Sequence, residues 1–209
     1  MIPSDSRVSL SGVDVSRETE ARLGQLVELV RKWTAHINLV SAKSLSEIWD
    51  RHVLDSLQLF KFLPGGTRHW ADLGSGGGFP GLAICIVAKE HMPMMKVTLV
   101  ESDLRKATFL RTVVRELDLS AVVKAVRIEA AEPLMADVLS ARALGPLNQL
   151  LTFSERHLAE AGICLFPKGR QVKQEIDAAR LNWHFELTSY PSTTDPEAQI
   201  LRVENIRHV

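Results

Sequence analysis

The stretch HWADLGSGGGFPGLAICIVA, residues 69–88, sets five glycines between a short apolar segment and a second apolar run of helical character. The glycines lie between Gly74 and Gly81 and follow closely after Asp72. Glycine costs backbone entropy on folding, so such a cluster needs a reason. Glycines let a ligand approach the backbone, and the N–H groups at a helix start are free to donate hydrogen bonds. The stretch therefore predicts a strand, a ligand-binding loop and a helix in succession.

From residue 66 onward, segments typical of strands alternate with segments typical of helices. Strands are predicted at 69–73, 96–101, 123–128, 136–141, 162–167, 183–189 and 199–206, and helices at 80–90, 103–118, 146–160 and 170–180. Such alternation predicts parallel strands with helices on both faces. The linker PSTTDPEAQ is too short for a helical crossover, so the last two strands should pair antiparallel. The expected fold class is α/β, with five parallel strands and an antiparallel C-terminal hairpin.

The chain before this region reads as helical. Ser16 is a candidate N-cap, and apolar residues follow it at helical spacing: Leu23, Leu26, Val27 and Val30. The capping-box pattern Ser44-Leu45-Ser46-Glu47 predicts a second helix, which the PGG at 64–66 ends. We therefore expect an N-terminal helical extension over residues 1–65 and a ligand-binding domain over residues 66–209.

The composition argues against several classes of protein. The chain has 209 residues, of which 45% are apolar and 24% charged, as is typical of a globular protein. Its longest apolar run, Leu82 to Ala88, is too short to span a bilayer, and MIPSDSRVSLSG shows no secretion-signal pattern. The two cysteines, Cys85 and Cys164, lie in apolar runs, and no metal-ligand spacing occurs. We expect a cytoplasmic monomer with no metal and no membrane partner.

The end of the second predicted strand narrows the choice of ligand. Glu101 lies 20 residues after Gly81, where an acidic side chain can accept hydrogen bonds from both hydroxyls of a ribose. Gly76-x-Gly78-x-x-Gly81 matches the dinucleotide fingerprint. Asp72-x-Gly74-x-Gly76-x-Gly78 matches the first motif of class I S-adenosylmethionine-dependent methyltransferases. We favour S-adenosylmethionine, because Asp72 would face a diphosphate unfavourably but an ammonium group favourably.

Six segments in the same order carry a more specific resemblance. They are KWTAHINLVS (32–41), RHVLDSL (51–57), ADLGSGGGFPGL (71–82), ESDLRKATFLR (101–111), SARAL (140–144) and FPKG (166–169). Together they resemble the RsmG (GidB) family of bacterial 16S ribosomal RNA guanine-N7 methyltransferases. Asn38-Leu39, Arg51-His52-x-x-Asp55-Ser56 and Phe79-Pro80-Gly81 are specific to that family in combination. The glycine motif alone would not be.

The resemblance implies a Rossmann-like class I methyltransferase fold and a site for S-adenosylmethionine. The residues it places at that site, together with the glycine loop, are Gly74, Gly76, Gly78, Phe79, Ala130, Ala131 and Arg142, with Glu101 at the ribose. Family members often carry a glutamate where this alignment has Ala130-Ala131, and a shift of one residue would bring in Glu132. The resemblance further implies methyl transfer to N7 of a guanine in the 530 loop of 16S rRNA. The partner is then the 16S rRNA or the small ribosomal subunit.

The chemistry of guanine N7 suits these residues. N7 carries an in-plane lone pair and no proton, so its attack on a sulfonium methyl group requires neither a general base nor a covalent enzyme nucleophile. Catalysis should come mainly from positioning the donor and acceptor in line. We therefore assign no catalytic residue, and Cys85 and Cys164 read as packing residues.

The net charge of zero means that any footprint for RNA must be local. The candidate phosphate contacts are Arg31, Lys32, Arg51, Arg105, Lys106, Arg111, Arg115, Lys168, Arg170 and Lys173, of which we single out Lys168 and Arg170 as the RNA-positioning pair. His52 and Asp55 are one helical step apart and predict a structural imidazole–carboxylate pair. An ion pair between Arg51 and Asp55 is the alternative.

Three rival functions remain open at this point. An NAD(P)-dependent oxidoreductase would need a proton relay such as Tyr-x-x-x-Lys, but no lysine follows the single tyrosine, Tyr190. A non-catalytic RNA-binding factor would not need Glu101 beside a complete glycine loop. Methylation of a small molecule fits the cofactor motifs equally well, so the RNA assignment depends on the resemblance.

Overall fold

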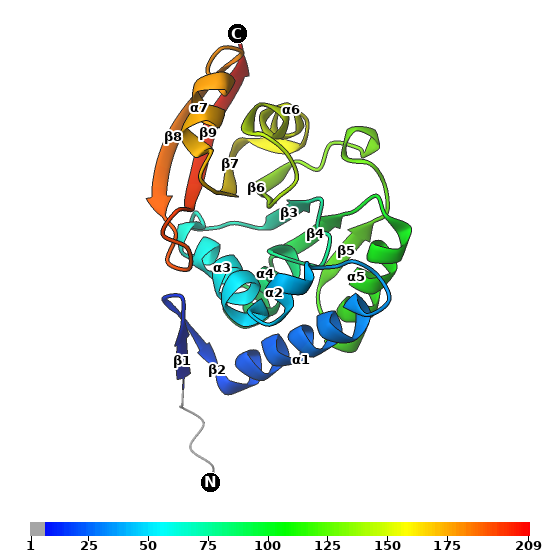
Figure 1. Ribbon diagram of the computed structural model, residues 1–209. Helices are drawn as coiled ribbons and strands as arrows, with labels where there is room; N and C mark the ends of the chain where they lie inside the picture. The colour runs from blue at the N-terminus through cyan, green and yellow to red at the C-terminus, as the bar shows by residue number, and fades with distance from the viewer. Residues whose placement is uncertain (1–6) are drawn as a thin grey trace.

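The computed structural model describes residues 7–209 and contains a mixed sheet of seven strands in the order β5-β4-β3-β6-β7-β9-β8 (Figure 1). The strands are β3 (His69–Leu73), β4 (Lys96–Val100), β5 (Ala121–Lys124), β6 (Ala136–Ala141), β7 (Leu158–Lys168), β8 (Trp183–Pro191) and β9 (Gln199–His208). Strands β3 to β7 run parallel, whereas β9 pairs antiparallel with both β7 and β8. The predicted α/β fold with an antiparallel C-terminal hairpin is confirmed.

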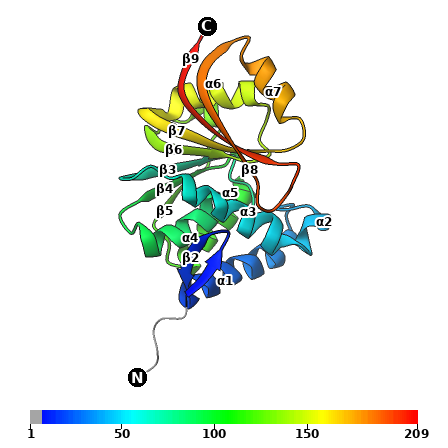
Figure 2. The same ribbon diagram turned by 90° about the vertical axis from the view of Figure 1, so that its left-hand side faces the viewer.

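Helices cover both faces of this sheet (Figures 1 and 2). They are α4 (Gly81–His91), α5 (Leu104–Glu116), α6 (Leu147–His157) and α7 (Val172–Ala179). Helices α4 and α5 pack on one face and α6 and α7 on the other. Neighbouring strand residues divide between the two hydrophobic clusters, because side chains alternate along a strand: Trp70 joins the α4 side and Ala71 the α6 side.

The N-terminal region begins with a two-stranded hairpin, β1 (Arg7–Leu10) and β2 (Val13–Ser16), that the sequence pattern did not predict. Ser16 then caps α1 (Arg17–Thr34) by accepting a hydrogen bond from Thr19 N, as predicted. The start of the MIPSDSRVSLSG stretch, residues 1–6, lies outside the described residues.

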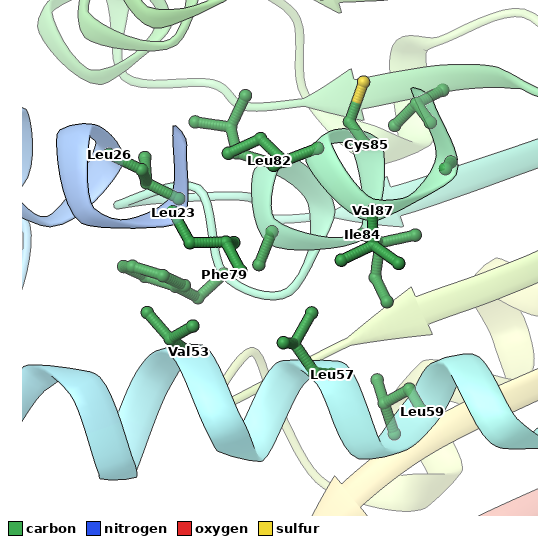
Figure 3. Packing of buried hydrophobic residues seen from close by; sticks show 14 of the residues in the cluster. Leu23, Leu26, Val53, Leu57, Leu59, Phe79, Leu82, Ile84, Cys85 and Val87 are labelled. Carbon is green, nitrogen blue, oxygen red and sulfur yellow. The ribbon is translucent and has the colours of Figure 1, made fainter. Parts of the chain in front are cut away.

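The second N-terminal helix is broken, so the prediction of one helix from a Ser44 cap is wrong. Ser41 is the cap of a short α2 (Ala42–Leu45), and Ser44 donates its hydroxyl back to Ser41 O from within that helix. A π-helical turn (Trp49–Leu54), α3 (Asp55–Leu57) and a 3-10 helix (Gln58–Phe62) follow. Their apolar residues still pack inward: Figure 3 shows Val53 and Leu57 facing Phe79, with Leu23 of α1 beside them.

Two boundaries in the C-terminal half also differ from the prediction. β5 ends at Lys124 and not at residue 128, because its partner β4 ends at Val100, which pairs with Lys124. The chain then forms a 3-10 turn at Ile128–Ala130. Helix α6 ends at His157, and residues 158–160, predicted as helix, begin strand β7. Over residues 7–209, no helix combines the length and the apolar character needed to cross a bilayer.

Candidate functional site

The glycine loop, residues 74–78, joins β3 to α4 and depends on glycine for two reasons. Gly74, Gly76 and Gly78 have φ values of +67°, +52° and +89°, in the left-handed region that side chains rarely adopt. A Cβ atom on Gly74 would lie 2.6 Å from Leu144 Cδ1, and one on Gly78 would lie 2.3 Å from Leu82 Cδ1. Above Gly76 the nearest heavy atom is Gly74 O at 3.7 Å. The loop therefore leaves open space at Gly76 that a ligand can fill.

Asp72 lies buried beside the start of α4 and lines neither of the two cavities described below. The expectation that its carboxylate faces the ammonium group of a ligand is therefore wrong. Its side chain shares a strand face with Trp70 beneath α4, and the residue is 1% exposed. Asp72 Oδ1 accepts a hydrogen bond from Ser140 Oγ at 2.7 Å, and Oδ2 accepts one from Gly81 N at 3.3 Å. Burial raises the pKa of Asp72 to about 6, although the bonds from Ser140 and Gly81 oppose the rise. The carboxyl group anchors the start of α4.

Glu101 lines a cavity of about 330 Å³ at the carboxyl ends of β4 and β5, called here the Glu101 cavity. Its Oε2 accepts a hydrogen bond from Gly76 N and its Oε1 one from Asp103 N, both at 2.8 Å. A carboxylate offers about four acceptor positions, so each oxygen keeps one for a ligand hydroxyl. The cavity is lined by Gly74, Gly76, Val100, Glu101, Ser102, Lys106, Val126, Arg127, Ile128, Glu129, Ala143, Leu144, Gln149 and Phe153.

Ala130 and Ala131 do not line this cavity, whereas Ile128 and Glu129 do. Because β5 ends at Lys124, the chain reaches the cavity earlier than the alignment assumed. Ala131 is 3% exposed, and its carbonyl accepts two hydrogen bonds from Arg156. The residues that line the cavity are thus two positions upstream of the pair that the alignment proposed. The short edge strand was the signal that could have found them, since the end of β4 at Val100 sets the end of β5.

A second and wider cavity, of about 1170 Å³, opens on the other side of the glycine loop; we call it the Arg142 cleft. Eight of the predicted cofactor and phosphate contacts line it: Gly74, Gly76, Phe79, Arg142, Arg51, Lys106, Lys168 and Arg170. The two cavities adjoin, because they share five lining residues: Gly74, Gly76, Lys106, Ala143 and Leu144. Gly78 lines neither cavity and packs against Leu82.

Arg142 connects the sheet to the N-terminal extension across this cleft. Its Nη1 donates to Asp55 Oδ2 at 3.2 Å and to Arg51 O at 2.9 Å, and its Nη2 donates to His52 Nδ1. The guanidinium also lies 5.8 Å from the centre of the Phe79 ring. Burial, followed by the charges of Arg142 and Arg51, lowers the pKa of His52 to about 3, so the imidazole is neutral at pH 7.

Neither predicted partner of Asp55 is observed among the described residues. Asp55 and His52 both bind Arg142 and do not bind each other. The side chain of Arg51 pairs with Glu47 at 3.3 Å. Sequence spacing suggested contacts within one helix, but the π-helical turn at Trp49–Leu54 rotates these side chains away from regular α-helical positions.

Lys168 and Arg170 both reach the cleft, but a carboxylate accompanies each of them. Lys168 is 9% exposed, and its Nζ donates to Glu175 Oε2 and to Gly145 O, both at 2.7 Å. Arg170 Nε donates to Glu197 Oε2 at 2.7 Å. Lys168 is therefore largely buried and holds the 142–147 segment through Gly145 O and through Glu175, which also accepts from Leu147 N.

Cys85 and Cys164 are buried away from both cavities. Burial raises the pKa of each thiol to about 12, which leaves them protonated and unreactive at neutral pH. Their interpretation as packing residues is confirmed.

Comparison with solved structures places the fold among methyltransferases. The chain is similar to a TYW2 from M. jannaschii solved in complex with AdoMet, with a TM-score of 0.57 and 12% identity over 84% of this chain and 80% of that one. It is also similar to a TehB-like SAM-dependent methyltransferase from Corynebacterium glutamicum, with a TM-score of 0.55 and 15% identity over 90% and 100% of the two chains. At these identities the likeness establishes the class I methyltransferase fold.

Sequence comparison is more specific. The chain is 50% identical over 206 residues to the ribosomal RNA small subunit methyltransferase G of Ruegeria sp. (strain TM1040), covering 99% of this chain and 100% of that protein. It is 52% identical over 200 residues to the protein of the same name from Cereibacter sphaeroides (strain ATCC 17029 / ATH 2.4.9), covering 96% and 97% of the two chains. Residues 19–201 match the family model GidB, described as rRNA small subunit methyltransferase G. The chain therefore belongs to the rRNA small subunit methyltransferase G (GidB) family.

Proposed function

We propose that this protein transfers the methyl group of S-adenosylmethionine to N7 of a guanine in the 530 loop of bacterial 16S rRNA, in the cytoplasm. Membership of the family supports an rRNA of the small subunit as the substrate. The observation that carries the proposal is the pair of adjoining cavities, which meet at Gly74 and Gly76. One is small enough for a nucleoside, and the other is open enough for a nucleotide of a macromolecule.

The residues present fit S-adenosylmethionine. Glu101 keeps free acceptor positions on both oxygens for the ribose hydroxyls, and Gly76 leaves room where a Cβ would stand. Ile128 and Glu129 stand on the far side of the Glu101 cavity, where the adenine would lie. Arg142, which lines the cleft and precedes the shared residue Ala143, offers a cation for the carboxylate of the methionine part. When bound, the cofactor supplies an electrophilic methyl group on a sulfonium centre.

The residues of the cleft orient the substrate and do not exchange protons with it. Guanine N7 has no proton to lose, so no residue needs to act as a base. His52 is neutral, and its Nδ1 accepts a hydrogen bond from Arg142 Nη2. The guanidinium must be the donor, because it carries only N–H groups and stays protonated. The Arg142–Asp55 pair holds the cation at the wall of the cleft. Holding two reactants in line is worth several kcal/mol, roughly 7–11 in the best intramolecular cases.

The test combines label transfer with mapping of the base. The wild-type protein is incubated with radiolabelled S-adenosylmethionine and small ribosomal subunits that lack the modification. We expect one labelled guanine in the 530 loop, sensitive to the borohydride–aniline cleavage that marks N7-methylguanosine. Label on another atom or another RNA would contradict the substrate assignment, and label only on small metabolites would support the small-molecule alternative.

A calorimetric titration tests the cofactor separately. S-adenosylmethionine or its demethylated product should bind the wild-type protein. Glu101→Gln should bind it at least tenfold more weakly, because the amide NH2 group that replaces one carboxylate oxygen cannot accept a hydrogen bond from the loop N–H or from a ribose hydroxyl. Glu116→Gln, on the exposed surface of α5, is the matched control. Heat with NADH but none with S-adenosylmethionine would favour the oxidoreductase alternative.

A further inference from the structure

Cations gather on one part of a chain whose net charge is zero. The segment from Leu104 to Arg127, which forms α5, the following turn and the edge strand β5, holds six cations and two carboxylates. We call the six the α5 cationic face: Arg105, Lys106, Arg111, Arg115, Lys124 and Arg127. In Figure 1, α5 and β5 lie side by side at one end of the sheet, next to the C-terminal part of α1.

Most charges of this face are available to an anionic partner. Among residues 7–209, five of the six form no ion pair, and Arg105 pairs only with Asp103, the cap of its own helix, at 3.4 Å. On α1, by contrast, three of the four cations are paired with carboxylates: Arg17 with Glu20, Arg22 with Glu18 and Arg31 with Glu28. Lys168 and Arg170 have their own carboxylates as well.

The fold gains little from these cations. Arg105 and Lys106 occupy the first turn of α5, where the helix dipole disfavours positive charge by a few tenths of a kcal/mol. Arg111 makes one long hydrogen bond, to Val123 O at 3.4 Å, and Arg115 is exposed. A cluster of repelling charges without internal partners is typical of a surface that meets an anionic macromolecule.

The face continues directly from the reaction site. Lys106 lines both the Glu101 cavity and the Arg142 cleft, and Arg127 lines the Glu101 cavity. We propose that the α5 cationic face binds the phosphodiester backbone of the 16S rRNA beside the target nucleotide. This proposal rests on the proposed function. Arg111 and Arg115, one helical turn apart, then serve as RNA-docking residues rather than as parts of the cofactor site.

The experiment compares two double variants with the same change in charge. Arg111→Gln with Arg115→Gln removes two unpaired cations from the face, and Arg17→Gln with Arg22→Gln removes two paired cations from α1. Methylation of small subunits is measured at several salt concentrations. For the α5 variant we expect kcat/KM to fall about 30-fold near 0.1 M salt, and the slope of log(kcat/KM) against log[salt] to lessen by about 1.4–1.8, since each phosphate contact contributes about 0.7–0.9. The α1 variant should change less than about twofold.

Binding of S-adenosylmethionine, measured by calorimetry, and the melting temperature should be unchanged in both variants. An α5 variant with a wild-type salt slope, or an equal loss in the α1 variant, would overturn the proposal. A loss that arises from weaker cofactor binding would overturn it as well. Failure of the proposed function is recognised separately: mapping then finds the wild-type label away from guanine N7, whatever the docking variants do.

Discussion

At the scale of single residues, both the backbone conformation and the packing at position 74 require glycine. Its φ of +67° disfavours any side chain, and a Cβ there would press on Leu144 Cδ1 at 2.6 Å. Leu144 and its neighbour Ala143, itself at a φ of +53°, line both cavities. A change at Gly74 is therefore transmitted to the boundary at which methyl donor and acceptor would meet.

Replacing Gly74 with alanine should weaken both cofactor binding and the fold. We expect the Kd for S-adenosylmethionine to rise at least tenfold, because Leu144 is displaced into the cavity. The free energy of unfolding should fall by about 1–3 kcal/mol from the unfavourable φ. Calorimetric titration and denaturant unfolding measure the two effects.

Gly65→Ala is the matched control for this substitution. Gly65 has no atom within 4 Å of an added Cβ and no φ in the left-handed region, so both quantities should stay within error. Wild-type cofactor affinity in Gly74→Ala would show that the loop is not in contact with the ligand.

The predicted residues that the structure brings to the cavities, such as Gly74, Gly76 and Glu101, are those whose identity depends on the local backbone. The glycine loop and Glu101 follow from a strand end and a helix start, which a pattern of residues can reveal. The orientation of Asp72 was predicted wrongly, because it depends on which face of β3 helix α4 covers, and the local sequence does not show this. The Arg142–Asp55 ion pair joins positions 87 residues apart, and no local pattern predicts such a contact.

At the scale of elements, Glu90 of α4 joins three segments that the sequence pattern treated separately. Its carboxylate accepts hydrogen bonds from Ser16 N and Ser16 Oγ at 3.0 Å and from Thr19 Oγ1 at 2.6 Å, and Arg7 Nη2 donates at 2.6 Å. The side chain thus fastens the β1–β2 hairpin and the start of α1 to α4. Burial alone would raise the pKa of Glu90, but these bonds outweigh it and lower the pKa to about 2.

Glu90 should therefore make stability depend on pH in a defined window. Because its folded pKa lies below the ordinary 4.5, its contribution is complete above pH 4.5 and is lost as the pH falls towards 2. Glu90→Gln should lower the free energy of unfolding by about 1–3 kcal/mol at pH 7, from the loss of charged hydrogen bonds. The difference from wild type should shrink between pH 4.5 and 2, as followed by urea unfolding.

Glu116→Gln again serves as a control, since this exposed side chain has no hydrogen bond among the described residues. A constant difference between Glu90→Gln and wild type over the whole pH range would contradict the role of the Glu90 charge.

Element prediction succeeded where strands are buried along almost their whole length and are rich in apolar residues, as in β3, β4 and β6. It failed at the margins of the sheet and in the extension. β5 is shortened by its partner β4, and the β1–β2 hairpin has only four residues in each strand. The helix expected from Ser44 is broken, yet Val53 and Leu57 still join the cluster that contains Phe79, so tertiary packing here outweighs a regular helical period.

At the scale of the whole molecule, the N-terminal extension and the sheet share one hydrophobic cluster. Leu23 and Leu26 of α1, Val53 and Leu57 of the broken helix, and Trp70 of β3 all belong to it. Figure 3 shows Leu23 and Val53 against Phe79, the residue that follows the glycine loop. The wall of the Arg142 cleft is thus supported by the extension, so the cofactor site and the extension should lose structure together.

Leu23→Ala tests this coupling. Leu23 is fully buried, so its truncation should cost about 2–5 kcal/mol and lower the melting temperature by roughly 10 °C. If the cluster is continuous, calorimetry shows one transition in both wild type and variant, with equal calorimetric and van't Hoff enthalpies. Leu181→Ala, at a side chain that is 78% exposed, should leave the melting temperature unchanged. A separate early transition in Leu23→Ala, with S-adenosylmethionine still binding above it, would mean that the extension folds apart from the site it borders.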